Sequence, residues 1–358
     1  MSFRAILGLL TVAGMSTIGM STTTGAVSFS TTGATANPTL TPLISSAGKA
    51  ESAVQVGPSY LVSDMDGTVK MYKADGSLDN SFTPISSLAN PRGLAVNSAG
   101  TKLWVAHDGG VSEYSLTASG ATRDRTYDLT LFQIDKPNGL CLNEDESKLF
   151  VTQPGWKAFP YGADGVNALV MLTVGSMQTV VLFRDRAGHT PNGCVVKGMT
   201  IWMMNQKDGL TSFRYDNNQH ILTYDFAAAV KTYQQDNQEV GDGIVFYEDK
   251  WYLSSWKPMP AQGAIHVCDP WNTATPCTEY STEVACDMQL GGTVWDPVLL
   301  LPSIMGQSVK ILSLPAPANP PPSPTTTPAV PQATDQNADC AFLPYTLMLP
   351  LLCLFKHV

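Results

Sequence analysis

Four stretches of similar sequence recur along the chain at nearly constant spacing. They are PRGLAV at residues 91–96, PNGLCL at 137–142, PNGCVV at 191–196 and GDGIVF at 241–246, with a weaker fifth copy, GGTVW, at 291–295. The glycines that these copies share are 46, 54, 50 and 49 residues apart, and are Gly93, Gly139, Gly193, Gly243 and Gly292. A period of roughly 20–50 residues is the signature of a repeat architecture, so these segments decide the fold.

A second apolar run that contains an aromatic residue follows each of the first four copies. These runs are KLWVA at 102–106, KLFVT at 148–152, TIWMM at 200–204 and KWYLS at 250–254. Alternating third runs begin after a glycine, as at residues 110–116 and 209–215. The alternation and the content of β-branched and aromatic residues indicate strands, and we expect the recurrent tryptophans to pack between sheets.

Three or four short antiparallel strands in each repeat are typical of a β-propeller blade. Residues 51–314 number 264, which gives 44 residues for each of six blades. The sequence therefore predicts an all-β, six-bladed β-propeller over residues 39–314. The first blade would be 51–88 and the sixth about 286–314, with residues 39–46 available to complete the ring. A seven-bladed propeller or a β-sandwich matches this spacing less well.

The composition restricts the class of partner. The chain has 358 residues, 44% of them hydrophobic and only 14% charged, with 21 Lys and Arg against 30 Asp and Glu. The net charge of −9 leaves no basic surface for a phosphate backbone, so nucleic-acid binding is not expected.

Both ends of the chain resemble targeting segments. A short apolar run followed by small residues predicts a signal peptide over residues 1–26, with an end as late as residue 36. Residues 315–340 are rich in Pro and Thr and predict an extended stalk. The apolar tail at 341–358 resembles a glycolipid-anchor signal, with a short membrane anchor or a simple apolar tail as alternatives. We therefore expect a secreted or surface-attached protein whose only membrane contact is this tail.

The chain has seven cysteines. Cys268, Cys277 and Cys286 lie in one loop-rich stretch, so one disulfide among them is expected in an oxidising compartment. Cys141 and Cys194 lie within apolar strand patterns and are expected to be buried thiols. The chain has no CxxC or HExxH motif, so a zinc site of the usual kind is not expected.

Residues 64–68, DMDGT, resemble the nucleophile motif of haloacid-dehalogenase-type phosphatases. That chemistry requires a parallel sheet covered by helices, whereas helical patterning is nearly absent here. Asp66-Gly67 also occupies the position in its repeat that Asp108-Gly109 and Asp208-Gly209 occupy in theirs. We therefore interpret it as a hairpin turn.

The innermost strand of each propeller blade begins beside the central channel. The residue before each repeated glycine should therefore lie at one channel mouth. These residues are Arg92, Asn138, Asn192, Asp242 and Gly291. Converging amides and a carboxylate could bind a small ligand or a hard cation, although Asn or Asp before Gly also serves to satisfy turn backbone groups.

Asn138, Asn192 and Asp242, at steps of 54 and 50 residues, resemble the regucalcin/gluconolactonase (senescence marker protein-like) family of six-bladed propellers. The resemblance implies that Asn192 and Asp242 bind a divalent metal with Glu51 of the first blade, and that Asn138 contacts substrate. The family has a Glu-Ser-Pro-Val stretch where this chain has Glu51-Ser-Ala-Val. The repeats also resemble NHL-type repeats, which often form binding surfaces.

Two functions follow as expectations. The first is a metal-dependent hydrolase of a small lactone or ester, with Ca²⁺ as the expected ion and Mg²⁺ or Zn²⁺ as alternatives. Asp242 would take a proton from water, and Arg92 would favour an anionic or carbonyl group or else pair with Asp242. His107, His189 and His266 are weaker candidates for proton transfer. The second function is a non-catalytic extracellular propeller that binds a protein or glycan partner.

Overall fold

The computed structural model describes most of residues 40–317. The described ranges are 27–29, 40–155, 166–184, 190–205, 209–215, 222–230, 240–257, 262–269, 277–282, 285–293 and 296–317. The chain divides into two units, residues 1–318 and 319–358, and every described residue belongs to the first. The predicted signal peptide at 1–26, the anchor signal at 341–358 and the stalk beyond residue 317 lie outside the described residues, as does His189.

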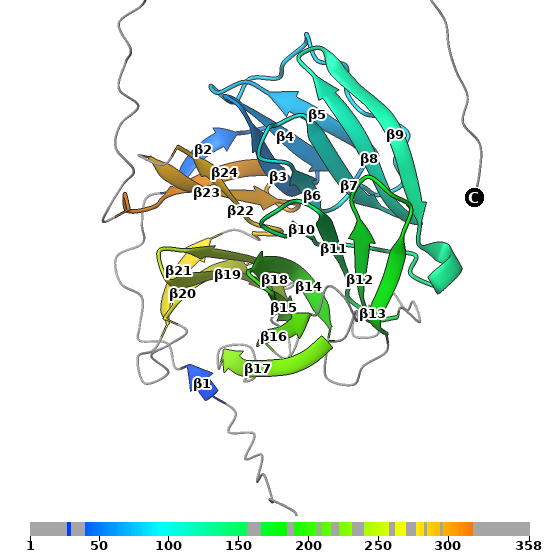
Figure 1. Ribbon diagram of the computed structural model, residues 1–358. Helices are drawn as coiled ribbons and strands as arrows, with labels where there is room; N and C mark the ends of the chain where they lie inside the picture. The colour runs from blue at the N-terminus through cyan, green and yellow to red at the C-terminus, as the bar shows by residue number, and fades with distance from the viewer. Residues whose placement is uncertain are drawn as a thin grey trace, which may run out of the picture. The chain divides into compact units, whose positions relative to one another are not determined.

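The described residues form six sheets arranged around one axis (Figure 1), which confirms the predicted all-β, six-bladed propeller. The strands of the first three blades are β3 (Ala50–Val56), β4 (Ser59–Asp64) and β5 (Thr68–Tyr72); β6 (Leu94–Val96), β7 (Lys102–His107), β8 (Gly110–Thr117) and β9 (Gly120–Asp128); and β10 (Leu140–Leu142), β11 (Lys148–Gln153), β12 (Ala168–Thr173) and β13 (Thr179–Arg184). Within each blade the paired strands are antiparallel.

The last three blades close the ring. Their strands are β14 (Pro191–Lys197), β15 (Thr200–Asn205), β16 (Gly209–Tyr215) and β17 (Leu222–Val230); β18 (Val240–Tyr247), β19 (Lys250–Lys257), β20 (Gln262–Cys268) and β21 (Thr278–Thr282); and β22 (Gln289–Gly292), β23 (Pro297–Ser303) and β24 (Ser308–Ser313). The N-terminal strand β2 (Thr41–Ile44) pairs with β24 and completes the sixth blade, as predicted. A further strand, β1 (Val27–Phe29), runs parallel to β17 at the outer edge of the fourth blade.

The described residues form six hydrophobic clusters, and each cluster is shared by two neighbouring blades. One joins the first and second blades through residues such as Leu61 and Leu103, and another joins the sixth and first through Val298 and Val62. The other four follow in order around the ring. Because each sheet buries both faces against its neighbours, its strands alternate less between apolar and polar residues than a sheet with one solvated face.

The recurrent aromatic residues serve this packing. Trp104 and Trp251 are 1% exposed, and the ring centroids of Trp202 and Trp251 are 4.7 Å apart between the fourth and fifth blades. The interpretation of Asp66-Gly67 as a hairpin turn also agrees with the structure, since Gly67 lies between β4 and β5 with a φ of 110°. Helical structure among the described residues is limited to one 3-10 turn, Thr130–Phe132. In the part of the chain that the structure describes, no helix has the length and apolarity to span a membrane.

The disulfides differ in part from the prediction. Cys268 and Cys277 are bonded, in agreement with the expectation of one bridge in that stretch, and Cys286 is a buried free thiol. Cys141 and Cys194, expected to be thiols, form a second disulfide. They lie on the adjacent inner strands β10 and β14, where their Cα atoms are 5.7 Å apart, within the range of a disulfide. A pattern along one strand cannot show that the neighbouring blade supplies a partner.

Candidate functional site

The innermost strands of three blades contain an irregularity at the predicted site residues. The pairing of β3, β14 and β18 with the next strand of the same blade shifts between Ala50 and Ala53, Pro191 and Cys194, and Gly241 and Ile244. These shifts release Glu51, Asn192 and Asp242 from the regular ladder. A β-bulge re-aims side chains in this way and is common beside functional sites.

The repeated glycines allow neighbouring inner strands to touch. Gly93 N donates a hydrogen bond of 3.1 Å to Asn138 O of the next blade. A Cβ atom on Gly193 would lie 2.5 Å from Asp242 O, and one on Gly243 would lie 2.8 Å from Cys286 O. Only glycine fits such close backbone contacts. The motif that reveals the repeat in the sequence is therefore the element that brings the blades together at the axis.

The contacts of the glycines identify one axial residue in each blade. The six axial residues are Glu51, Arg92, Asn138, Asn192, Asp242 and Cys286, and all six are at most 6% exposed. Five were predicted, but Gly291, which was expected in the sixth blade, is wrong. Gly291 lies in β22 against the side chain of Gln55, and Cys286 occupies the axial position instead. The sixth blade lacks the Asn-Gly or Asp-Gly signal at that position, so the motif search placed it five residues too late.

Side chains replace the glycines where the sixth and first blades meet. Ser52 and Asp287 occupy the two glycine positions and form an isolated parallel bridge. Ser52 Oγ donates a hydrogen bond of 3.0 Å to Asp287 Oδ2, and Asp287 N donates one of 3.1 Å to Glu51 O. Asp287 is 4% exposed and adds a third buried carboxylate near the axis. The sequence reasoning did not find Asp287; counting the mean blade length of 44 residues on from Asp242 leads to the neighbouring Cys286.

Two hydrogen bonds fix the carboxylate of Asp242. Asn192 Nδ2 donates to Oδ1 over 2.9 Å, and Trp256 Nε1 donates to Oδ2 over 2.9 Å. Other polar atoms beside it are buried without a partner among the described residues: Glu51 Oε2, Asn192 Oδ1, and both Oδ1 and Nδ2 of Asn138. Buried polar atoms in native proteins are nearly always hydrogen-bonded, so this cluster can bind a further group.

The charges at the axis are unbalanced. Burial raises the pKa of Glu51, and the charge of Arg92 opposes this rise. Burial, together with the charges of Glu51 and Asp287, raises the pKa of Asp242 well above its usual value. Burial, with a smaller contribution from Glu51, raises the pKa of Asp287 to about 7. Three carboxylates thus share a low-dielectric site in which Arg92 is the cation of the axial ring, and an added cation would stabilise their ionised forms.

Arg92 does not pair with Asp242, one of the two alternatives predicted for it. Its Nη2 forms an ion pair of 2.7 Å with Asp108 Oδ1, and its Nη1 donates a hydrogen bond of 3.4 Å to Pro137 O. Asp108 lies in the β7–β8 turn of the blade that contains Arg92, and its carboxylate forms the ion pair with the guanidinium. Glu51 is still close enough for Arg92 to affect its pKa.

The two histidines within the described residues contact groups of their own blades. His107 contacts the hydroxyl of Ser112 through Nε2 over 2.8 Å and the carbonyl of Asp108 through Nδ1 over 2.9 Å. His266 is 1% exposed and contacts Ser255 Oγ over 3.0 Å, and burial lowers its pKa to about 4. Their partners are strand and turn groups of their own blades, as expected of structural histidines.

Amide and carboxylate oxygens are the donors that this site offers to a metal. Among the described residues, no group of three or more His, Cys, Asp and Glu side chains is arranged to hold an ion. Glu51, Asn192 and Asp242 supply two carboxylates and one amide, and two of the unpartnered oxygens belong to this set. The donor chemistry therefore fits a hard divalent cation, which takes oxygen ligands.

The fold and the axial site define the protein as a six-bladed β-propeller with a polar, acidic channel mouth. Among solved structures it is similar to a luciferin-regenerating enzyme, with a TM-score of 0.56 and 9% identity over 76% of this chain and 94% of that one. It also matches Kuenenia stuttgartiensis hydrazine synthase, with a TM-score of 0.47 and 11% identity over 75% of this chain and 78% of that one. The first likeness supports the fold alone. No protein family and no curated protein matches the sequence.

Proposed function

We propose that the protein is a metal-dependent hydrolase that acts on small lactones or esters at the polar mouth of the propeller. The observation that supports this most is the group of unpartnered polar atoms on Glu51, Asn138 and Asn192. An unsatisfied buried polar group costs roughly 1–3 kcal/mol, so a bound group that contacts these atoms would offset that cost. The excess of carboxylates at the axis favours a cation as one such group.

Glu51, Asn192 and Asp242 would hold the cation, and their oxygen donors suit Ca²⁺ or Mg²⁺ better than Zn²⁺. When bound, such an ion polarises an ester carbonyl and lowers the pKa of water. Asp242 would accept the proton of the attacking water, held in place by Asn192 and Trp256. The Asn138 amide would contact the substrate, and Arg92, oriented by Asp108, would attract the carboxylate that hydrolysis produces.

The disulfides support an extracellular location for this activity. Cys141–Cys194 and Cys268–Cys277 are each formed between residues of the folded propeller. Disulfides persist in secreted and surface proteins and are rare in reducing compartments. We therefore place the hydrolase outside the cytosol, either secreted or attached through its C-terminal segment.

Metal binding is tested first, because it does not require a known substrate. The dialysed full chain is analysed for Ca, Mg and Zn, and its thermal unfolding is followed with EDTA and with each chloride salt. At 100 times its Kd a cation should stabilise the native state by roughly 2.7 kcal/mol. Asn192→Ala and Asp242→Asn should lose this response, and Asp79→Asn, at an exposed carboxylate, should keep it. A metal-free protein whose unfolding no salt changes contradicts the proposal.

Hydrolysis is then assayed with γ-butyrolactone, δ-valerolactone and phenyl acetate. We expect EDTA-sensitive turnover, and Asp242→Asn should lower kcat/KM by about 100-fold or more because a general base contributes roughly 10²–10⁴-fold. Asn138→Ala should raise KM more than it lowers kcat. If the protein binds a cation without turnover on any ester, the alternative of a non-catalytic propeller that binds a protein or glycan is favoured.

A further inference from the structure

A cavity lies along the propeller axis, beyond the level of the axial carboxylates. In every blade the residues that line it follow the axial residue by two to four positions along the inner strand. A strand rises about 3.3 Å for each residue, so the cavity lies beyond the polar ring along the axis. Each of the six inner strands supplies residues to the wall of the cavity, and examples are Val54, Val96, Leu142, Val195, Phe246 and Leu290.

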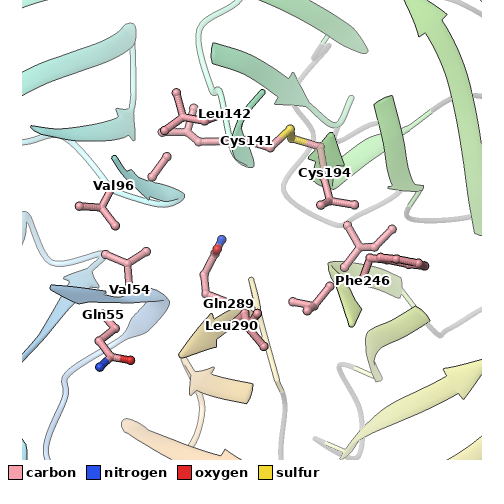
Figure 2. A pocket seen from close by; sticks show the side chains of 14 residues that line it. Val54, Gln55, Val96, Cys141, Leu142, Cys194, Phe246, Gln289 and Leu290 are labelled. Carbon is pink, nitrogen blue, oxygen red and sulfur yellow. A yellow bond between two sulfur atoms is a disulfide. The ribbon is translucent and has the colours of Figure 1, made fainter. Parts of the chain in front are cut away.

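The glycine contacts explain why this space exists. At the polar ring the inner strands approach to backbone contact, because glycine carries no side chain there. Beyond that level every strand carries side chains that keep the strands apart, and a volume of about 330 Å³ remains. The Cys141–Cys194 disulfide forms part of the wall (Figure 2) and links two of the strands covalently. The cavity therefore follows from the arrangement of the inner strands, and the disulfide restricts the movement of two of them.

The chemistry of the lining restricts the ligand. Among the described residues that line it, none is charged, and the polar ones are Gln55 and Gln289. A buried charge without a partner is costly, so the ligand must be uncharged. A volume of 330 Å³ lies at the lower end of the roughly 300–1,000 Å³ of small-molecule sites.

Gln289 is the group that can contact such a ligand. The Gln55 amide is already used, since Nε2 donates to Gly57 O over 2.8 Å and Oε1 accepts from Gly292 N over 2.5 Å. Gln289 stands near the centre of the ring of lining side chains (Figure 2). Its Nε2 is 3.4 Å from Asp287 Oδ2, and its Oε1 has no hydrogen-bond partner among the described residues. This acceptor can receive a hydrogen bond from a hydroxyl or N–H group of a ligand.

We propose that this cavity, lined by the ends of the six inner strands, is a second binding site for a small, uncharged, mainly apolar molecule that donates one hydrogen bond to Gln289. The site is separate from the metal and substrate contacts proposed above. Its occupancy requires neither a cation nor hydrolysis.

The probe for this site is N-phenyl-1-naphthylamine, an uncharged aromatic amine with one N–H whose fluorescence rises in apolar surroundings. It is titrated into the full chain in the presence of EDTA, so that the outcome does not depend on the proposed hydrolase. Leu290 is 46% exposed at the cavity, and Leu131 is 80% exposed on the 3-10 turn outside the cavity. Leu290→Asp should weaken binding by about tenfold or more, because it places a charge against an apolar ligand, and Leu131→Asp should leave it unchanged.

A second variant tests the hydrogen bond. Gln289→Met keeps the length of the side chain and removes the acceptor, so binding of the probe should weaken by about fivefold, which corresponds to one hydrogen bond worth roughly 1 kcal/mol. Binding of its N-methyl derivative, which has no N–H, should not change. Near-ultraviolet circular dichroism checks that each variant is folded. A signal that does not saturate, or that is equal in the wild type and in folded Leu290→Asp, overturns the proposal.

Discussion

Asn192 Nδ2 donates a hydrogen bond of 2.9 Å to Oδ1 of Asp242, which lies 50 residues later in the sequence and in the next blade. Trp256 donates to the other carboxylate oxygen, so Asp242 is held by two hydrogen bonds. Oδ1 of Asn192 has no partner among the described residues. A base fixed from two sides loses little freedom when a ligand arrives, which is the condition for efficient proton transfer. The interblade contact thus joins the architecture of the repeat to the chemistry proposed for the site.

Asp287 should make the stability of the metal-free protein depend on pH. Its pKa is raised to about 7, so between about pH 4 and pH 7 the native state holds a proton that the unfolded chain releases. The stability that Asp287 contributes is therefore fully present below about pH 4 and is lost as the pH rises through 7. Asp287→Asn should remove a slope that approaches 1.4 kcal/mol per pH unit for one proton.

Urea unfolding in EDTA at pH 5, 6, 7 and 8 measures this slope. Asp75→Asn, at an exposed carboxylate whose pKa is lowered by its bonds to Ser77, is the matched control and should retain the wild-type slope. Equal slopes for the wild type and Asp287→Asn would show that Asp287 stays ionised in the native protein.

The sequence was sufficient to predict the blades, because the backbone contact between neighbouring inner strands requires a glycine that recurs in the sequence. The axial approach of neighbouring strands needs glycine, and the residue before that glycine points to the axis; Arg92, Asn138, Asn192 and Asp242 follow from this one rule. The rule fails at the sixth blade, where Asp287 and Ser52 make the contact through side chains. No glycine marks that contact, so the glycine motif could not locate Cys286 and Asp287, and only the blade spacing of 44 residues from Asp242 points to them.

Other features depend on relations between blades that the chain order does not encode. Pairing of Cys141 with Cys194 requires knowing that two inner strands lie side by side at the same height. The ion pair between Arg92 and Asp108 depends on the conformation of the β7–β8 turn. The cavity exists because the inner strands are in backbone contact at the glycines and are kept apart by side chains further along the axis. In the sequence, each lining residue resembles an ordinary core residue.

Gly193→Ala tests whether close axial contact is essential to the fold. The added Cβ would lie 2.5 Å from Asp242 O and 2.9 Å from Gly243 Cα, so the fourth and fifth blades would have to separate. We expect a loss of roughly 1–3 kcal/mol or more in the free energy of unfolding, as for other overpacked sites. Gly120→Ala is the control, because its Cβ would come no closer than 3.5 Å to Thr83, and it should change stability by less than about 0.5 kcal/mol. Similar losses for both variants in urea would contradict this role of Gly193.

The Cys141–Cys194 disulfide should stabilise the propeller more than the Cys268–Cys277 disulfide. The first closes a separation of 53 residues and the second one of 9, and the loop-entropy contribution increases with loop length. Replacing both cysteines of the first pair by Ser should lower stability by about 4 kcal/mol, against about 2.5 kcal/mol for the second pair. Unfolding of the two double variants by guanidinium measures the difference, and the reverse order would show that strain or residual structure outweighs loop entropy.

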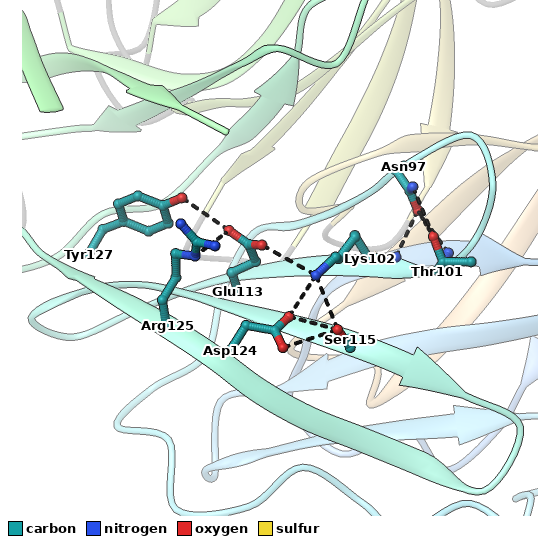
Figure 3. Close-up of polar contacts among 8 residues, drawn as sticks. All are labelled: Asn97, Thr101, Lys102, Glu113, Ser115, Asp124, Arg125 and Tyr127. Carbon is teal, nitrogen blue, oxygen red and sulfur yellow. Dashed lines mark hydrogen bonds and ion pairs between the residues drawn. The ribbon is translucent and has the colours of Figure 1, made fainter. Parts of the chain in front are cut away.

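Glu113 lies at the centre of a network of charges on the second blade (Figure 3). It is 2% exposed on β8, and its Oε2 accepts a hydrogen bond of 3.0 Å from the Tyr127 hydroxyl and lies 3.3 Å from Arg125 Nε. Its Oε1 is 3.6 Å from Lys102 Nζ, which also contacts Asp124 Oδ2 over 2.9 Å. The buried carboxylate therefore connects the outer strands β8 and β9 with β7.

Glu113→Ala should lower the free energy of unfolding by about 1.5–3 kcal/mol, because it leaves the buried Tyr127 hydroxyl without its acceptor and the two cations without a shared partner. Asp124→Ala removes a carboxylate from the same network, but its side chain is 25% exposed and Lys102 is 37% exposed, so water replaces it at a cost below about 1 kcal/mol. Denaturation at low and high NaCl separates the two further. The effect of Asp124→Ala should fade in salt, whereas that of Glu113→Ala should remain, since buried pairs are screened less. Equal losses at both salt concentrations for both variants would mean that burial of Glu113 adds nothing to the network.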